Sequence, residues 1–138
     1  MSSVVEIYNK TVQTLSKQQY LPAIMLLQAL FLTSIYAAGM GIDIYYLPLV
    51  GAAITAHIYS AIGIAVLALL GLGAGLKSNS LLLKILMIMN AVSVVAAAFF
   101  GLIYFGGESY PIFAYGMGLG YIFVLFTCIG GLFYALRK

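Results

Sequence analysis

His57 is the side chain best suited to chemistry in this sequence, and it is the only histidine among 138 residues. It falls one or two turns inside a long apolar segment, where an ionisable residue indicates a functional site. Imidazole ligates haem iron, copper or zinc, and it also relays protons. The structural alternative is a neutral histidine bonded to a tyrosine or a backbone carbonyl. His57 is therefore the candidate metal ligand, with haem as the candidate cofactor.

Two methionines are expected on the same side of the membrane as His57. Met40 ends the first apolar segment, and Met117 lies early in the fourth. Either could be the second axial ligand of a haem, since His and Met together ligate haem iron; a homodimer offering His57 twice is another route. The same cluster suits Cu(I), which prefers soft thioether ligands. The alternative is that both methionines are ordinary filler of membrane helices.

Three tyrosines lie deeper than the membrane interface and belong to the same half as His57. They are Tyr59, Tyr115 and Tyr121. Together with His57 they could line a cavity for a flat ring such as a haem or a quinone, because ligand pockets combine aromatic walls with a few polar groups. An aromatic belt at the membrane interface is the alternative.

Composition excludes several classes of protein. Charged residues make up 7% of the chain, against about a quarter in an ordinary soluble domain, and the mean hydropathy is +1.14. A water-soluble enzyme and a disordered tail are therefore excluded. The six basic residues are scattered and do not form the patch that a nucleic-acid partner requires. The single cysteine excludes a disulfide framework within the chain.

Long uncharged stretches divide the chain into four membrane spans. Each exceeds the roughly 20 apolar residues that cross a bilayer core, and each must be helical because hydrocarbon offers its backbone groups no partners. The sequence predicts an all-α, polytopic membrane protein, a four-transmembrane-helix bundle over residues 20–138. Its helices are expected at about 21–40, 51–72, 82–105 and 111–136.

Charges at the ends of these segments predict the orientation. All basic residues fall on one side of the predicted bundle, and both acids between helices fall on the other. The positive-inside rule then places both termini in the cytoplasm of a multi-pass cell-membrane protein. The basic residues are Lys10, Lys17, Lys77, Lys84, Arg137 and Lys138, and the acids are Asp43 and Glu108.

Residues 1–19 are polar and precede the first span. Ser3 and Glu6 have the spacing of a capping box, and apolar residues from Val4 to Leu15 recur roughly at helical spacing. The segment is predicted to be an amphipathic helix on the cytoplasmic membrane surface. A frayed polar tail is the alternative.

The first two predicted helices resemble the last two. The second and fourth helices align at a shift of 58 residues, although apolar sequences also align by chance. The similarity predicts two repeated helical hairpins about an axis along the membrane normal, with a ligand site between the halves. The aligned pairs are Gln28-Ala29 with Asn90-Ala91, Ala56-His57 with Ala114-Tyr115, and Ile64 with Ile122.

Small and polar residues within the helices predict packing. Two glycine pairs have the GxxxG spacing that lets membrane helices approach closely, within the bundle or between protomers. They are Gly71 with Gly75 and Gly116 with Gly120.

Four polar residues of the spans also have predicted partners. Gln28 and Asn90 are expected to bond each other across the repeat axis. Thr127 is expected to bond back to its own helix, and Cys128 to be an inert buried thiol.

The residues around His57 resemble one half of the haem A synthase family. The order of glycine, proline and helix-opening histidine is found in Gly39-Met40-Gly41, Tyr46-Leu47-Pro48-Leu49, and Ala56-His57 with Gly63. The resemblance implies a four-helix unit that binds b-type haem through His57. Tyr115 stands where that family has a second histidine, and the family's outer-loop cysteines and acidic catalytic residue are missing, so synthase activity is not implied.

Three functions remain as hypotheses. The first is an accessory or structural subunit of a membrane complex of respiratory type, with haem b on His57. The second is a stand-alone membrane cytochrome or haem-handling protein, and the third is a channel or carrier for a small neutral solute. No catalytic residues are predicted, and a non-enzymatic role is favoured. The expected partners are the lipid bilayer and either copies of this chain or a larger membrane complex, with no nucleic acid.

Overall fold

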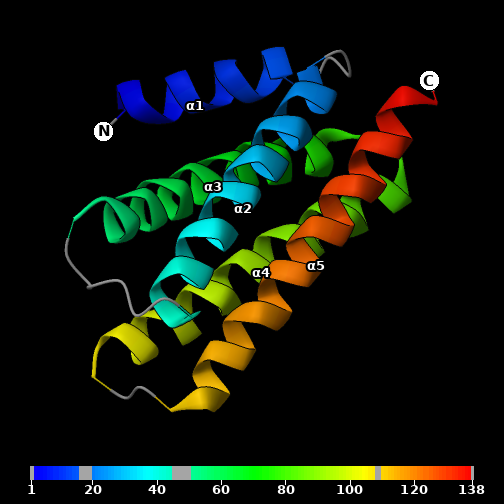
Figure 1. Cartoon of the computed structure of the whole chain (residues 1–138). Helices are drawn as coiled ribbons and strands as arrows, with labels where there is room; N and C mark the ends of the chain where they lie inside the picture. The colour runs from blue at the N-terminus through cyan, green and yellow to red at the C-terminus, as the bar shows by residue number, and fades with distance from the viewer. Residues whose placement is uncertain (1, 16–19, 45–50, 108–109, 138) are drawn as a thin grey trace.

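The computed structural model describes residues 2–15, 20–44, 51–107 and 110–137, and these form five α-helices (Figure 1). Within the described residues, the last four helices are long and apolar enough to cross a membrane. The predicted all-α class is therefore confirmed, and the four predicted spans correspond to helices that could cross a membrane. The helices are α1 (Ser2–Leu15), α2 (Leu21–Ile44), α3 (Ala52–Lys77), α4 (Leu81–Phe105) and α5 (Pro111–Leu136).

Helix α3 continues five residues beyond its predicted end. Its last turns contain Gly71, Gly73 and Gly75, and such glycines are typical of helix ends. Here they face neighbouring helices instead: a Cβ on Gly73 would lie 2.9 Å from Val12 of α1, and one on Gly75 would lie 2.6 Å from Met87 of α4. Close packing between helices therefore explains this glycine-rich stretch.

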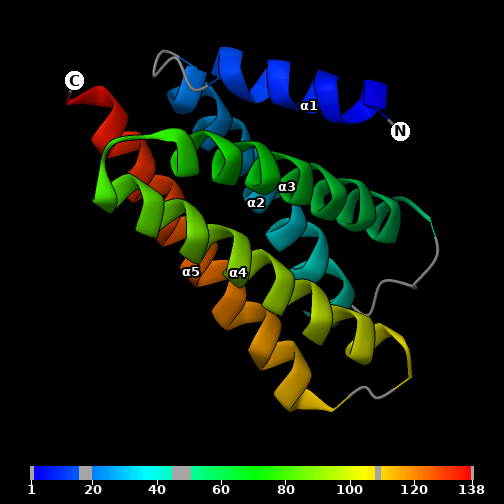
Figure 2. The same cartoon turned by 180° about the vertical axis from the view of Figure 1, so that it is seen from behind.

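The four long helices form a bundle in which each packs against two neighbours. The main contacts join α2 with α3, α3 with α4, α4 with α5, and α5 with α2, so successive helices run in opposite directions around the bundle. We call the end that carries the C-terminus, the start of α2 and the turn between α3 and α4 the terminal end, and the opposite end the far end (Figures 1 and 2).

The described basic residues gather toward the terminal end. Lys77 ends α3, Lys84 lies in the first turn of α4, and Arg137 follows α5. Which end faces the cytoplasm stays a prediction. Lys17, Lys138 and Glu108 lie outside the described residues, as does Tyr46-Leu47-Pro48-Leu49 of the haem A synthase resemblance.

Both GxxxG pairs are used inside the bundle. Gly75 admits Met87 of α4, as described above. A Cβ on Gly116 would lie 2.7 Å from the Phe100 ring of α4, and one on Gly120 would lie 2.6 Å from the Cβ of Ala97. Distances this short mean that the helix backbones approach as closely as they do because a side-chain carbon is missing. Of the two predicted roles for these glycines, packing within the bundle is confirmed.

The predicted register between α3 and α5 is wrong. A shift of 58 residues pairs Ile64 with Ile122, but Ile64 is 5% exposed and Ile122 is 58% exposed. A shift of 60 residues pairs buried positions instead, and at this shift Gly71 and Gly131 both face Met25 and Met87. The apolar alignment missed this shift because it gave no information on which face of each helix packs. The corresponding buried pairs are Ser60 with Gly120, Ile64 with Val124, Ala68 with Cys128, and Gly71 with Gly131.

Residues 2–15 form a helix and not a frayed tail, and this helix packs against α3. Val12 is 1% exposed and faces Gly73, while the Tyr8 hydroxyl donates a hydrogen bond to the Leu69 carbonyl at 3.4 Å. Both contacts join residues 61 positions apart, so α1 and α3 run in the same direction where they touch. The two views show α1 alongside α3 (Figures 1 and 2).

Candidate functional site

Four polar side chains meet near the middle of the bundle, and we call them the polar centre. They come from three helices and are at most 2% exposed. Buried polar groups are costly unless each has a hydrogen-bond partner, most of all where no water is at hand. The polar centre consists of Gln28 of α2, Asn90 of α4, and Thr127 and Cys128 of α5.

A closed ring of hydrogen bonds satisfies the polar centre. The Gln28 amide donates to Asn90 Oδ1 at 3.0 Å, the Asn90 amide donates to Cys128 Sγ at 3.7 Å, and the Cys128 thiol donates to Gln28 Oε1 at 3.2 Å. The Gln28 amide also donates to the Ile64 carbonyl at 3.4 Å, and the Asn90 amide to Thr127 Oγ1 at 2.8 Å. All four long helices therefore contribute to one network, and the predicted bond between Gln28 and Asn90 is confirmed.

Sequence reasoning missed two members of this network. Thr127 does bond back to its own helix, at the Val124 carbonyl, as predicted, but it also accepts from Asn90. Cys128 is buried as predicted, yet its thiol takes part in the ring. The available signal was their place on the stripe of α5 that also carries Gly120, Val124 and Gly131, spaced three or four residues apart along one helix face.

A layer of methionine and glycine lies on the terminal side of the polar centre. Met25 of α2 and Met87 of α4 are almost fully buried. Each lies within contact distance of the spaces left by Gly71 of α3 and Gly131 of α5. Flexible thioether side chains fill irregular gaps well. This methionine layer and the polar centre together fill the axis of the bundle in its terminal half.

His57 lies toward the far end, on the face of α3 that packs in the bundle. Its ring is half-buried and meets the Phe105 ring of α4 edge-on, with centroids 5.6 Å apart. A Cβ on Gly39 of α2 would lie 3.7 Å from its Cε1. The imidazole therefore lies among α2, α3 and α4, and the same face continues through Ser60, which donates a 2.9 Å hydrogen bond to Ser34.

Met117 occupies the place in the second hairpin that His57 occupies in the first. It follows His57 by 60 residues, which is the shift that relates the buried positions of α3 and α5. A Cβ on Gly101 of α4 would lie 3.1 Å from its sulfur, and Gly101 follows Gly39 by the same 62 residues that separate Asn90 from Gln28. Met117, and not Tyr115, is therefore the structural counterpart of His57.

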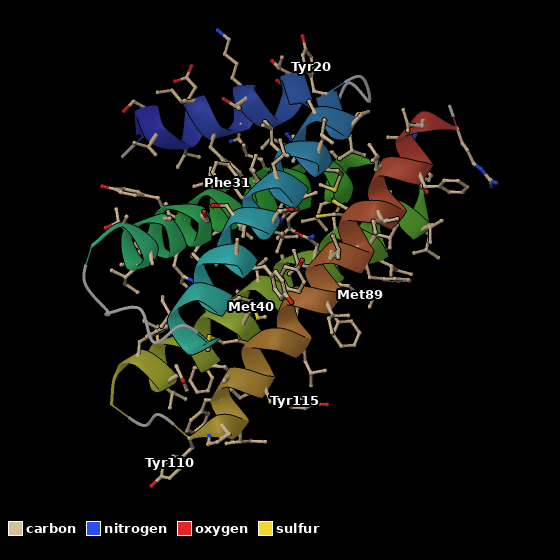
Figure 3. All side chains as sticks on the ribbon, in the orientation of Figure 1. Tyr20, Phe31, Met40, Met89, Tyr110 and Tyr115 are labelled. Atoms are coloured by element: carbon tan, nitrogen blue, oxygen red, sulfur yellow. The ribbon has the colours of Figure 1, made fainter. Side chains whose placement is uncertain are left out.

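The six predicted site residues do not converge on one cavity. Residues two apart on a helix point roughly 200° apart, so Tyr59 cannot share the direction of His57, nor Tyr115 that of Met117. Tyr59 is 69% exposed and Tyr115 is 64% exposed, and Tyr115 points away from the bundle (Figure 3).

The two remaining candidates lie elsewhere at the far end. Tyr121 stacks on Tyr36 of α2, with ring centroids 5.3 Å apart. Met40 follows Gly39, the glycine beside the His57 ring, and is about two-fifths exposed. Among the residues that the structure describes, no three His, Cys, Asp or Glu side chains gather as metal ligands.

Comparison with known proteins gave no relative. No protein-family model matches the chain, and no curated protein or solved structure matches it either. The resemblance to the haem A synthase family therefore stays a prediction, and the function has to be argued from the site itself.

Proposed function

We propose that this protein is a non-enzymatic structural subunit of a membrane assembly, formed by copies of this chain or by a larger complex. The observation that carries the proposal is the filled bundle axis. The polar centre uses its amide and thiol donors internally, so these groups serve the packing of four helices and leave none of their donors for a substrate. Large apolar side chains project outward from α4 and α5, as expected of helices that contact lipid or other helices.

The same observation favours a structural role over a channel or carrier through one bundle. A solute path along the axis would have to pass Met25, Met87 and the polar centre, all almost fully buried. Moving them aside would break the hydrogen-bond ring that joins the helices. A transport role would therefore need a path between copies of the chain.

Orientation and ancestry form part of the proposal. Both termini face the cytoplasm of the cell membrane, as the clustering of Lys77, Lys84 and Arg137 at one end supports. The hairpins α2–α3 and α4–α5 are duplicates, as their corresponding buried positions support.

The test is the mass of the particle extracted from membranes in a mild detergent, measured by native mass spectrometry. We expect an assembly heavier than one 14.8 kDa chain that stays together at nanomolar concentration. A chain that is monomeric in mild detergent and brings no partner from its native membrane would contradict the proposal. Solute flux through liposomes that hold the monomer would instead favour the carrier.

Haem b binding through His57 is a second candidate, which a specific observation favours. His57 and Met117 occupy corresponding places in the two hairpins, each against a glycine of the preceding helix. His57 would provide the imidazole ligand, and Met117 or Met40 would provide a thioether. A haem held there would supply one-electron transfer. Helices α3 and α5 are diagonal in the bundle, so the group would join its two hairpins.

Visible spectra of the oxidised and dithionite-reduced protein test this candidate. We expect a Soret band that is lost in His57→Ala and shifted in Met117→Leu. Met89→Leu, a methionine on the surface of α4, is the matched control and should leave the spectrum unchanged. Colourless protein from haem-replete cells would refute haem binding without affecting the structural proposal.

A further inference from the structure

A shallow groove follows one face of α1. Its volume is about 330 Å³, and it is lined by Ile7, Lys10, Thr11 and Thr14. These residues have the spacing of one helix face. They offer one ammonium group and two hydroxyl groups, with an aliphatic side chain at the end nearer the N-terminus. A ligand with an anionic head and an apolar body fits this distribution.

The packing of α1 on α3 determines where the groove lies along the axis of the bundle. Tyr8 contacts Leu69, which lies eight residues before the end of α3, or about 12 Å along the helix axis. Because α1 runs in the same direction as α3, its N-terminal half lies beside the apolar part of that span. Val4, Val5 and Ile7 are between 58% and 70% exposed, and at this depth they meet acyl chains.

The charge of the surrounding surface matches an anionic headgroup. Lys10 lies one to two turns closer to the terminal end than the exposed valines, and Lys77, Lys84 and Arg137 lie at that same end. Anionic lipids attract such basic residues by about 1 kcal/mol each near the membrane surface. Thr14 donates its hydroxyl proton to the Lys10 carbonyl, which leaves its oxygen as an acceptor, while the exposed Thr11 hydroxyl can donate to a phosphate.

We propose that this groove binds an anionic phospholipid, with the phosphate at Lys10 and Thr11 and the acyl chains along Val4 and Ile7. The lipid site depends on α1 being packed at Gly73, and it is independent of the proposed subunit role. An amphipathic helix that binds a membrane by itself would need no such packing.

Native mass spectrometry of the full chain can test the site, with phosphatidylglycerol and phosphatidylcholine of identical acyl chains as probes. We expect phosphatidylglycerol to bind about fivefold more tightly, the ratio that about 1 kcal/mol gives. Lys10→Gln should abolish this preference. Lys77→Gln removes the same charge at the same end but outside the groove, and it should retain the preference.

Gly73→Leu separates the packed groove from a free amphipathic helix. The new side chain would displace Tyr8 and Val12, whose atoms lie 2.9 Å from a Cβ at that position, and the preference for phosphatidylglycerol should disappear although Lys10 is still present. Equal binding of the two lipids by the wild type, equal losses in Lys10→Gln and Lys77→Gln, or a preference that survives in Gly73→Leu would each overturn the proposal.

Discussion

At the terminal end of the bundle, side chains from all four long helices meet on the axis, whereas at the far end most contacts lie within one hairpin. Met25 and Met87 touch glycines of both α3 and α5. Toward the far end, Gly39 faces His57 within the first hairpin, and Gly101 faces Met117 within the second. The two halves therefore differ in what they join: the terminal half holds the two hairpins together on the axis, whereas the far half packs mainly within each hairpin.

Burial along α4 shows the same difference. Its buried residues are Leu83, Leu86, Met87 and Asn90, all in its first ten positions. From Ala91 to Phe105 every residue is half-buried or exposed. Aromatic contacts between the described residues join the two hairpins in this half, among them His57 with Phe105 and Tyr36 with Tyr121. Such contacts can rearrange without breaking the network at the polar centre.

The largest expected effect on the free energy of unfolding comes from replacing a methionine by alanine, and it should differ between the two halves of the bundle. Met87→Ala should lower the free energy of unfolding by about 3 kcal/mol, because it leaves a cavity in a fully packed layer. Met117→Ala should cost about 1 kcal/mol, because its side chain is only half-buried. Unfolding by SDS in mixed micelles, followed by circular dichroism, measures both. Equal losses would show that the two halves are packed alike.

The next effect tests the polar centre. Asn90→Leu keeps the volume but leaves one Gln28 amide proton without its acceptor, so the free energy of unfolding should fall by about 2 kcal/mol. The double variant Gln28→Leu/Asn90→Leu removes both partners and should cost at least about 1 kcal/mol less than the sum of the two single variants. Strict additivity in the same unfolding assay would mean that the ring of hydrogen bonds does not couple the helices.

Much of this fold could be predicted from the sequence, because the features that predict it, such as the length of an uncharged segment, depend only on position along the chain. Uncharged length predicted four spans, and the equivalent places of Gln28 and Asn90 predicted their bond. The helix faces were not readable, since nearly every position of α3 and α5 is apolar and hydropathy carries no periodicity there. The counterpart of His57 was therefore assigned to Tyr115, two residues and roughly 200° away from Met117.

The candidate site was less predictable than the fold. The sequence placed aromatic and sulfur-containing residues at the same end of the predicted bundle as His57, which suggested a shared cavity. Whether they line one cavity depends on the direction of each side chain. Tyr59 and Tyr115 point outward, while His57 and Met117 face the bundle. Thr127 was expected to bond only to its own helix and Cys128 to be an inert thiol, because a sequence shows a residue's possible partners on its own helix and none across the bundle.

The smallest expected effect asks whether the second hairpin stays closely packed as it approaches the far half. Gly120→Ala places a methyl group 2.6 Å from the Cβ of Ala97 and 3.2 Å from the Ser93 carbonyl oxygen. Because both neighbours belong to the α4 backbone region, α4 and α5 must separate slightly. The loss should be about 1 kcal/mol after the higher helix propensity of alanine is included.

Gly118→Ala is the matched control, since a Cβ on Gly118 meets nothing within 4 Å. It should be neutral or slightly stabilising in the SDS unfolding assay, because alanine restricts the unfolded chain. If the two variants behave alike, the close approach of α4 and α5 at Gly120 does not contribute to stability, and the far half is loose within hairpins as well as between them. If only Gly120→Ala is destabilised, the looseness is confined to the space between the hairpins, where His57 and Met117 face the bundle.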